Sequence, residues 1–349
     1  MSRSFGAPDR LFRPSVLCNW KDVMRILVTG AAGYIGSVVT ELLVEQRHDV
    51  VAVDSLQHGH AGAVSREAHF VQLDLLDGER LVKLLKDHRI EAVIHLAAEA
   101  LIDESIRDPG RFYRANMSGG LVLLDAMMSV GVKRLVFSST AAVYGEPARI
   151  PIEEGDSLAP VNSYGESKLA FERALPWYRR AHDLRYITLR YFNACGATRE
   201  HGEFHVPETH LIPVVFEVAL GQRPHIQLFG RDYDTPDGTC IRDYVHVVDI
   251  AQAHVLGLQQ IDMIGARAYN MGNSSGYSNA QVIEEVRAVT GRDIPVREAG
   301  RRPGDPARLV ASSQRIRAEL GWVPQFPDLR TMVETAWQWR LNNPQGYSA

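Results

Sequence analysis

The chain has 349 residues, of which 45% are hydrophobic and 23% are charged, as in an ordinary globular protein. Its formal net charge of −4 gives no electrostatic reason to expect binding to nucleic acid or to an anionic membrane, and neither is predicted as a partner. The three cysteines are far apart and odd in number, so we expect no disulfide framework, no metal site and a cytoplasmic location.

Residues 1–23 differ from the rest of the chain. They carry three arginines and two prolines, and they contain no apolar run long enough for a signal peptide or a membrane span. We expect a disordered or loosely packed leader, with Met24 as a candidate for the natural start. The first convincing strand begins at this methionine.

Short apolar runs alternate with amphipathic segments from residue 24 to about residue 191. The runs lack strict alternation of apolar and polar residues, as expected of parallel strands that are covered on both faces. We predict strands at 25–29, 49–53, 69–73, 91–97, 133–138 and 186–191, and helices at 34–46, 78–88, 109–129 and 163–181. The repeated strand–helix–strand order predicts an α/β fold with a doubly wound, Rossmann-like parallel sheet.

The alternation of apolar runs and amphipathic segments ends after residue 192, where Gly, Pro, Asp and His become frequent. Helix-like stretches follow near 211–220, 248–260, 278–290, 312–320 and 330–340. We therefore predict a second, smaller α+β domain that binds the substrate, formed by about 194–240 plus 266–349. The first domain would consist of 24–193 plus about 241–265.

The first predicted strand runs into a glycine-rich turn that opens a helix. Gly30, Gly33 and Gly36 are spaced Gly-x-x-Gly-x-x-Gly, with Tyr34 and Ile35 between the last two. Glycines at such a turn let backbone amides approach a pyrophosphate, and the helix N-terminus adds partial positive charge. The turn predicts a dinucleotide site that includes all five residues.

An acidic residue, Asp54, ends the second predicted strand. A carboxylate at this place accepts hydrogen bonds from the ribose hydroxyls and repels a 2′-phosphate, which favours NAD over NADP as the cofactor. Asp74 and Leu75 follow the third strand and are expected at the adenine. A tight turn with a surface aspartate is the alternative reading.

Tyr164 and Lys168 are four residues apart, so a helix places both side chains on one face. A fixed ammonium stabilises a phenolate, and we expect Lys168 to lower the pKa of Tyr164 and to hold the nicotinamide ribose. Thr140 ends the fifth predicted strand, at the edge where open α/β sheets bind ligands. We therefore predict that Tyr164 exchanges a proton with a substrate alcohol while Thr140 orients the same oxygen.

From Met24 almost to its last residue the chain resembles the extended short-chain dehydrogenase/reductase family, and within it the UDP-glucose 4-epimerases. The blocks that carry this resemblance are GAAGYIGS (30–37), VIHLAA (93–98), FSSTAAVYG (137–145), YGESK (164–168), LRYFN (189–193), DYDTPDGTCIRDYVH (232–246), RRPGD (301–305) and NPQGY (343–347). The resemblance implies a tightly held NAD that is reduced and reoxidised within one turnover. Hydride leaves C4 of a UDP-hexose and returns to the opposite face of a 4-keto sugar, which interconverts UDP-glucose and UDP-galactose in galactose metabolism.

The resemblance also implies binding residues. Asn116 and Phe192 would contact the cofactor, and the substrate would be bound by Asn193, His210, Leu211, Phe229, Arg242, Arg302 and Asp305. Arg242 and Arg302 would clamp the diphosphate, because guanidinium groups match phosphate oxygens. Phe229 would pack on the uracil and Asp305 would bind a ribose hydroxyl. His210 stands where many relatives have Asn.

Leu309 aligns with the position that gates the sugar pocket in this family. A bulky aromatic residue there would exclude an N-acetyl group and a small residue would admit it, so leucine is intermediate. We expect UDP-glucose and UDP-galactose as the main pair and N-acetylated sugars as poor substrates.

A simple dehydrogenase is possible only if the cofactor exchanges freely, and three further alternatives are considered. A 4,6-dehydratase is disfavoured because Ala141 and Ala142, which cannot transfer protons, stand where its acid and base would follow the strand-end threonine. A 4-epimerase of another UDP-sugar (N-acetylhexosamine, pentose or uronate) and a non-catalytic NAD-binding protein on the same fold stay possible. The resemblance further implies a homodimer formed through helices 109–129 and 163–181.

Overall fold

The computed structural model describes residues 23–302 and 305–347, so the predictions made for residues 1–22 lie outside the described residues. Its centre is a seven-stranded sheet in the order β11-β6-β5-β4-β1-β2-β3, and every neighbouring pair in it is parallel. The strands are β1 (Arg25–Thr29), β2 (Asp49–Asp54), β3 (His69–Gln72), β4 (Ala92–His95), β5 (Arg134–Thr140), β6 (Arg185–Tyr191) and β11 (Ala266–Met271). The doubly wound fold class is thereby confirmed.

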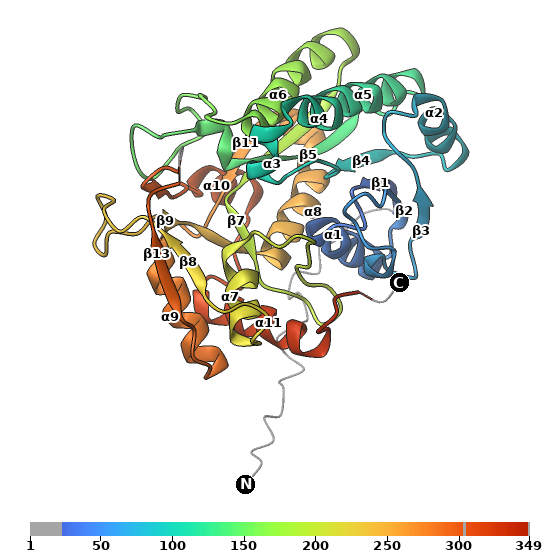
Figure 1. Ribbon diagram of the computed structural model, residues 1–349. Helices are drawn as coiled ribbons and strands as arrows, with labels where there is room; N and C mark the ends of the chain where they lie inside the picture. Colours follow the sequence, from blue (N-terminus) through green and yellow to red (C-terminus); the bar gives the residue numbers. More distant parts are fainter. Residues whose placement is uncertain (1–22, 303–304, 348–349) are drawn as a thin grey trace.

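Helices cover both faces of this sheet (Figure 1). Alternate strand residues point to opposite sides, so that Ile26 and Val28 of β1 join one core cluster and Leu27 joins the other. One face packs against α1 (Tyr34–Glu45), α8 (Val247–Ile264) and α10 (Gln314–Leu320); the other packs against α2 (Gly78–Asp87), α5 (Gly119–Ser129) and α6 (Ser163–His182). Burial on both sides explains why the strands read as continuous apolar runs.

A second group of elements has its own apolar core beyond the carboxyl ends of the central strands (Figure 1). It contains α7 (Leu211–Ala219), α9 (Asn279–Thr290) and α11 (Leu329–Asn342), with β8 (Ile226–Phe229) paired to β13 (Val296–Ala299). Two small sheets complete it: β12 (Tyr277–Ser278), β9 (Ile241–Arg242) and β14 (Arg308–Leu309) form one, and β7 (Asn193–Cys195) and β10 (Tyr244–His246) form the other.

The predicted boundary at residue 265 is wrong in one respect. β11 was expected in the second domain, but it pairs with β6 and forms the edge of the central sheet. α10 also packs into the core of the first domain. β11 follows α8 directly, whereas α10 is reached only after the chain has passed through β12, α9, β13 and β14. The division into two domains otherwise stays a prediction.

The predicted helix 109–129 is interrupted. It consists of α4 (Pro109–Phe112), a π-helical stretch over Tyr113–Ser118, and α5. A short helix, α3 (Ile102–Arg107), precedes it, and the strand-end turn after β5 is a 3-10 helix over Ala141–Tyr144. Within residues 23–302 and 305–347 no helix is long and apolar enough to cross a membrane.

Candidate active site

The glycine-rich turn between β1 and α1 is shaped by close backbone packing. Gly30 has φ of 72°, and a Cβ there would lie 2.5 Å from the backbone nitrogen of Ala97. A Cβ on Gly36 would lie 1.9 Å from the carbonyl oxygen of Gly30. Gly33 caps α1 without a side-chain hydrogen bond. The turn therefore presents backbone amides and a helix N-terminus, the arrangement that binds a pyrophosphate.

Tyr34 links this turn to the second group of elements. Its hydroxyl donates a hydrogen bond to the carbonyl oxygen of Gly196 at 2.6 Å, although Gly196 is 162 residues away in the sequence. Burial, and then the nearby Glu203 carboxylate, raise the pKa of this phenol well above its ordinary value. Ile35, the other predicted residue of the turn, is half-buried against the core.

Asp54 closes the turn from the end of β2. It is buried, and its Oδ2 accepts a hydrogen bond from the amide of Ala32 at 3.0 Å while Oδ1 accepts one from the amide of Leu56 at 2.8 Å. Burial raises the pKa of this carboxyl. Each carboxylate oxygen accepts two hydrogen bonds, so both retain capacity for ribose hydroxyls. The glycine turn and Asp54 together fit NAD.

The remaining cofactor residues lie near the same edge, and their roles stay predictions. Asp74 is exposed and accepts a hydrogen bond from the amide of Leu76 at 2.9 Å, while Leu75 is buried. Asn116 is buried, and its side-chain amide is bonded to the backbone of Glu99 and to the hydroxyl of Ser167. Its amide thus already has partners within the chain.

Tyr164 and Thr140 meet at the carboxyl edge of the sheet. Thr140 ends β5 and accepts a hydrogen bond from the amide of Ala142 at 3.1 Å, and Tyr164 lies in the first turn of α6, which Asn162 caps. Burial raises the pKa of Tyr164, and a hydrogen bond with Thr140 lowers it in part. The structure thus brings the two hydroxyl groups near one another, and their catalytic roles stay predictions.

Lys168 is placed differently from the expectation. Its side chain is 2% exposed, and Nζ donates a hydrogen bond to the carbonyl oxygen of Ser138 at 2.9 Å. Burial lowers the pKa of Lys168 to about 7, against the opposing effect of the Glu172 carboxylate. The pKa of Tyr164 is raised, not lowered, so the expected effect of the ammonium on the phenol is not seen. The physical reason is burial of both groups.

Behind Lys168 lies a buried polar network that the sequence did not reveal. Glu172 and Arg190 form an ion pair with side-chain exposures of 8% and 6%, and the hydroxyl of Ser139 also donates to Glu172. Ser138 shares a hydrogen bond with the hydroxyl of Tyr191. The available signals were an arginine inside an apolar strand and a glutamate one helical turn after Lys168. The network fixes α6 against β5 and β6.

Four of the predicted substrate residues lie on β8, on β9 and in the segment between β13 and β14. Arg242 is buried, and its guanidinium donates to the carbonyl oxygen of Pro306 at 2.8 Å and to Oδ1 of Asp305 at 3.1 Å. The guanidinium of Arg302 lies 4.5 Å from the ring centroid of Phe229. Both arginines are therefore held by this chain's own side chains, Arg242 by a carboxylate and Arg302 by an aromatic ring.

Two predicted site residues, Leu309 and Phe192, pack in the same small apolar cluster. Leu309 lies opposite Arg242 in the β9–β14 pairing and packs beside the buried Phe192. Phe192 joins the cluster that contains Ala141, the residue after Thr140. The predicted gate and the predicted cofactor residue therefore belong to one small apolar cluster near Thr140.

Asn193, His210 and Leu211 lie where the second group joins the sheet. Asn193 is exposed, and its side-chain amide has no hydrogen-bond partner among the described residues. His210 caps α7, and Leu211 is the first residue of that helix. Nδ1 of His210 lies 2.9 Å from Glu203 and 3.0 Å from Glu208. Burial opposes the imidazolium, but the two carboxylates outweigh it and raise the pKa of His210 well above its ordinary value.

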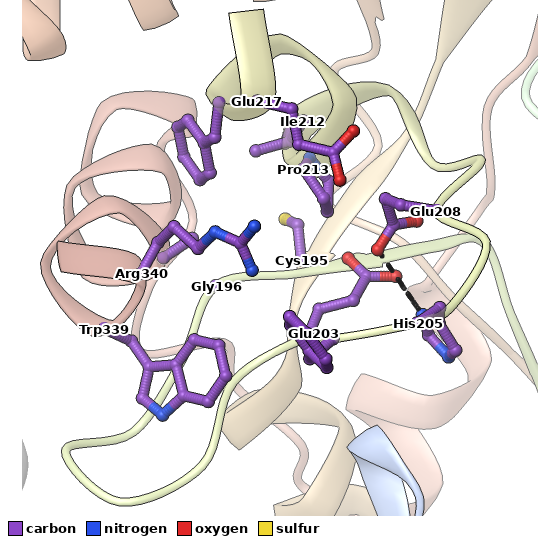
Figure 2. Close-up of a pocket in the computed structure, with 13 residues that line it drawn as sticks. Cys195, Gly196, Glu203, His205, Glu208, Ile212, Pro213, Glu217, Trp339 and Arg340 are labelled. Atoms are coloured by element: carbon purple, nitrogen blue, oxygen red, sulfur yellow. Dashed lines mark ion pairs between the residues drawn. The ribbon is translucent and has the colours of Figure 1, made fainter. Parts of the chain in front are cut away.

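The partners of His210 were missed in the sequence. Figure 2 shows Glu203 and Glu208 with their carboxylates turned toward His205, beside Cys195. Glu203, His205 and Glu208 lie in an irregular stretch without periodicity, where only the spacing of acidic and histidine residues offered a signal.

Comparison with known proteins gives consistent matches along the whole described fold. The model of the NAD dependent epimerase/dehydratase family matches residues 26–272. A UDP-glucose 4-epimerase of Halalkalibacterium halodurans is 50% identical over 93% of this chain and 98% of its own length. A crystal structure of a UDP-glucose 4-epimerase is 48% identical, with a TM-score of 0.91 over 93% of this chain and 100% of that chain.

A third similar structure was solved with ligands bound. The UDP-glucose 4-epimerase of Bifidobacterium longum, solved in complex with NAD+ and UDP, is 35% identical with a TM-score of 0.89, over 93% of this chain and 100% of that chain. The predicted family, the enzyme class and the NAD dependence are thereby confirmed. This chain, an isomerase that uses NAD, belongs to the NAD-dependent epimerase/dehydratase family, with UDP-glucose 4-epimerases as its relatives.

Proposed function

We propose that the chain interconverts UDP-glucose and UDP-galactose by inverting the configuration at C4 of the hexose. The observation that carries this proposal is the contact between Thr140 and Tyr164, beside the buried Lys168, at the edge where the glycine turn and Asp54 fit NAD. The names of the relatives, UDP-glucose 4-epimerases at up to 50% identity, support it.

In this mechanism the phenolate form of Tyr164 takes the proton of the C4 hydroxyl and later returns it. Thr140 hydrogen-bonds the same oxygen and holds it next to the phenol. Lys168, fixed to the backbone of Ser138, donates its other N–H groups to the ribose of the cofactor. Bound NAD supplies an acceptor and donor for the hydride of C4. Rotation of the 4-keto sugar between the two transfers then exposes its opposite face.

Elimination of water is disfavoured by the residues after Thr140. Ala141 and Ala142 form the 3-10 turn at the strand end, and neither side chain transfers a proton. A dehydratase needs an acid and a base at this place. The site is therefore suited to a redox step that is reversed, with no net oxidation.

The diphosphate and uridine are assigned to the residues near β9, β14 and α7. Arg242 and Arg302 neutralise the two phosphates. Arg302 then exchanges the ring of Phe229 for a phosphate, and Phe229 packs on the uracil. Asp305 accepts a hydrogen bond from a ribose hydroxyl, and the side-chain amide of Asn193 hydrogen-bonds to the sugar. Leu309 limits the space for a substituent at C2, which favours unsubstituted hexoses.

Oligomeric state and location are further parts of the proposal. A homodimer formed through α5 and α6 is supported by the exposed Trp177 on α6, whose side chain is 67% exposed. A cytoplasmic location and a role in galactose metabolism follow from the proposed substrate pair.

The proposal is tested by a product assay with UDP-galactose, repeated with Tyr164→Phe. We expect the variant to retain NAD and to lose about 10²–10⁴-fold in kcat, because proton transfer contributes this much. Tyr186→Phe is the matched control, since Tyr186 lies at the start of β6, away from the carboxyl edge. Near-normal turnover by the Tyr164 variant would contradict the mechanism.

A further inference from the structure

Four potential metal ligands converge before α7, outside the catalytic edge. They are Glu203, His205, Glu208 and His210, and one ligand atom from each lies within 4.8 Å of the others. From this geometry we propose that the chain binds one zinc ion here, held by two imidazole nitrogens and two carboxylates. No metal site was predicted from the sequence, because that expectation rested on the three widely spaced cysteines and not on these four residues.

The distances between the ligand atoms fit a tetrahedral ion. Nδ1 of His210 is 2.9 Å from Glu203 and 3.0 Å from Glu208, and Nδ1 of His205 is 3.6 Å and 3.7 Å from the same carboxylates. Zinc bonds of about 2.0–2.1 Å in a regular tetrahedron require edges of roughly 3.3 Å. The four observed nitrogen–oxygen separations bracket this value, and the two that involve Glu208 run from His210 to its Oε1 and from His205 to its Oε2.

One ligand atom is in a position that protein hydrogen bonds do not explain. Nδ1 of His205 is buried and has no hydrogen-bond partner among the described residues. The two carboxylate contacts of this nitrogen, at 3.6 and 3.7 Å, are too long for hydrogen bonds. A metal ion between the three side chains would give the nitrogen a partner without moving the backbone.

Charge also favours a divalent cation. The side chains of Glu203 and Glu208 are 10% and 4% exposed, so two carboxylates face one another with little water to screen them. One zinc ion with two neutral imidazoles balances both negative charges. The histidines are the more open side, with exposures of 27% for His205 and 45% for His210, which leaves an entry path for the ion.

The place of the cluster indicates a structural role. Oε1 of Glu208 accepts hydrogen bonds from the amides of Thr209 and His210 at the start of α7. Glu203, His205 and Glu208 also line the same hollow as Gly196, to which Tyr34 of the nucleotide turn is bonded (Figure 2). Four protein ligands leave no open position for a substrate, as in structural zinc sites. The ion would tie α7 to the nucleotide turn.

The test uses the full chain with its bound cofactor, treated with a chelator and then titrated with zinc chloride. We expect one equivalent to bind with a dissociation constant in the micromolar range or below, and Tm to rise with zinc concentration. Cobalt(II) in the same site should give the intense visible absorption of a tetrahedral complex.

The informative variants are Glu203→Gln and His205→Gln, because neither residue caps α7 and neither was predicted to touch substrate. Each should weaken zinc binding about tenfold or more and abolish the cobalt spectrum. His225→Gln is the control, since His225 has no hydrogen bond or ion pair among the described residues. A matching Tm of the variants without zinc shows that they fold.

Three results would overturn the proposal. They are no saturable zinc binding by the wild-type chain, unchanged zinc binding by both cluster variants, or a loss of zinc binding in His225→Gln as large as in the cluster variants. A folded wild-type chain that stays zinc-free would show that the cluster is held by hydrogen bonds alone. None of these readouts depends on the epimerase activity, so they are distinct from failure of the proposed function.

Discussion

Lys168 donates a hydrogen bond from Nζ to the backbone carbonyl oxygen of Ser138 at 2.9 Å. The ammonium is thus held by the main chain of β5, two residues before Thr140, and not by a carboxylate. Its pKa is lowered to about 7, chiefly by burial. The fold therefore tolerates a buried cation whose charge costs stability, which is typical of a functional position.

The pH dependence of stability should report this buried lysine. Between about pH 7 and the ordinary lysine pKa near 10.4, the unfolded chain binds one proton more than the folded chain. The free energy of unfolding therefore gains up to about 1.4 kcal/mol per pH unit from this residue as pH rises in that window. In Lys168→Met this contribution is absent.

The free energy of unfolding is measured with urea for the chain without its cofactor at pH 7, 8 and 9. We expect Lys168→Met to exceed wild type by the largest margin at pH 7. The difference should shrink as pH rises. Lys86→Met, at an exposed position of α2, is the control and should show no such trend. A difference that stays constant from pH 7 to 9 would mean that Lys168 is not the source.

Thr140 should contribute to catalysis through its hydroxyl alone. Thr140→Val keeps the shape of the side chain but removes the hydrogen bond to the phenol and to the substrate oxygen. We expect kcat for UDP-galactose to fall about 10²–10³-fold, as for other donors to a reacting oxygen, with bound NAD unchanged. Thr140→Ser should restore most of the rate. Steady-state kinetics decide this, and a valine variant with more than a third of wild-type kcat would argue against the role.

Gly30 should be required for close packing as well as for its backbone angle. Gly30 and Gly131 have φ of 72° and 79°, but a Cβ on Gly30 would clash with Ala97, whereas no described atom lies within 4 Å of one on Gly131. Both alanine variants bear the cost of the left-handed angle, and Gly30→Ala also bears the clash. We expect Gly30→Ala to be about 1–3 kcal/mol less stable than Gly131→Ala and to lose NAD. Chemical denaturation and the cofactor content of purified protein measure both effects, and equal stability of the two variants would show that the turn relaxes.

Leu309 should set the preference for the substituent at C2. Leu309→Ala enlarges the space beside Phe192, so we expect a higher ratio of turnover for UDP-N-acetylgalactosamine to that for UDP-galactose. Leu309→Tyr should lower the same ratio. Competition between the two substrates in one reaction gives the ratio directly. If both variants shift it in the same direction, Leu309 is not the gate.

Local patterns explain which parts of the fold were predictable. The strand at residues 25–29 was predicted at its observed bounds because its residues are apolar on both faces. The helix predicted at 109–129 was not seen to break, because the π-helical stretch depends on tertiary bonds of Asn116 to Glu99 and Ser167. β11 was misassigned because Ala266–Met271 is partly polar and pairs with a strand about 80 residues earlier.

In the candidate site, too, local features were predictable and tertiary contacts were not. Tyr164, Lys168 and Thr140 were found because a helical spacing and a strand end are local features. The carbonyl partner of Lys168 and the ion pair of Glu172 with Arg190 were not, since they join segments far apart in the chain. Charge alone predicted a lowered pKa for Tyr164, but burial, which sequence does not report, reverses the direction.

Transfer of the C4 hydride within one turnover is the central claim, and deuterium at C4 of UDP-galactose tests it most directly. After incubation in ordinary water with the enzyme and its bound NAD, the mass and NMR spectra of the product are measured. We predict UDP-glucose that keeps all of the label at C4, because the hydride leaves and returns without meeting solvent. Loss of the label to water, or its appearance at another carbon, would contradict the mechanism.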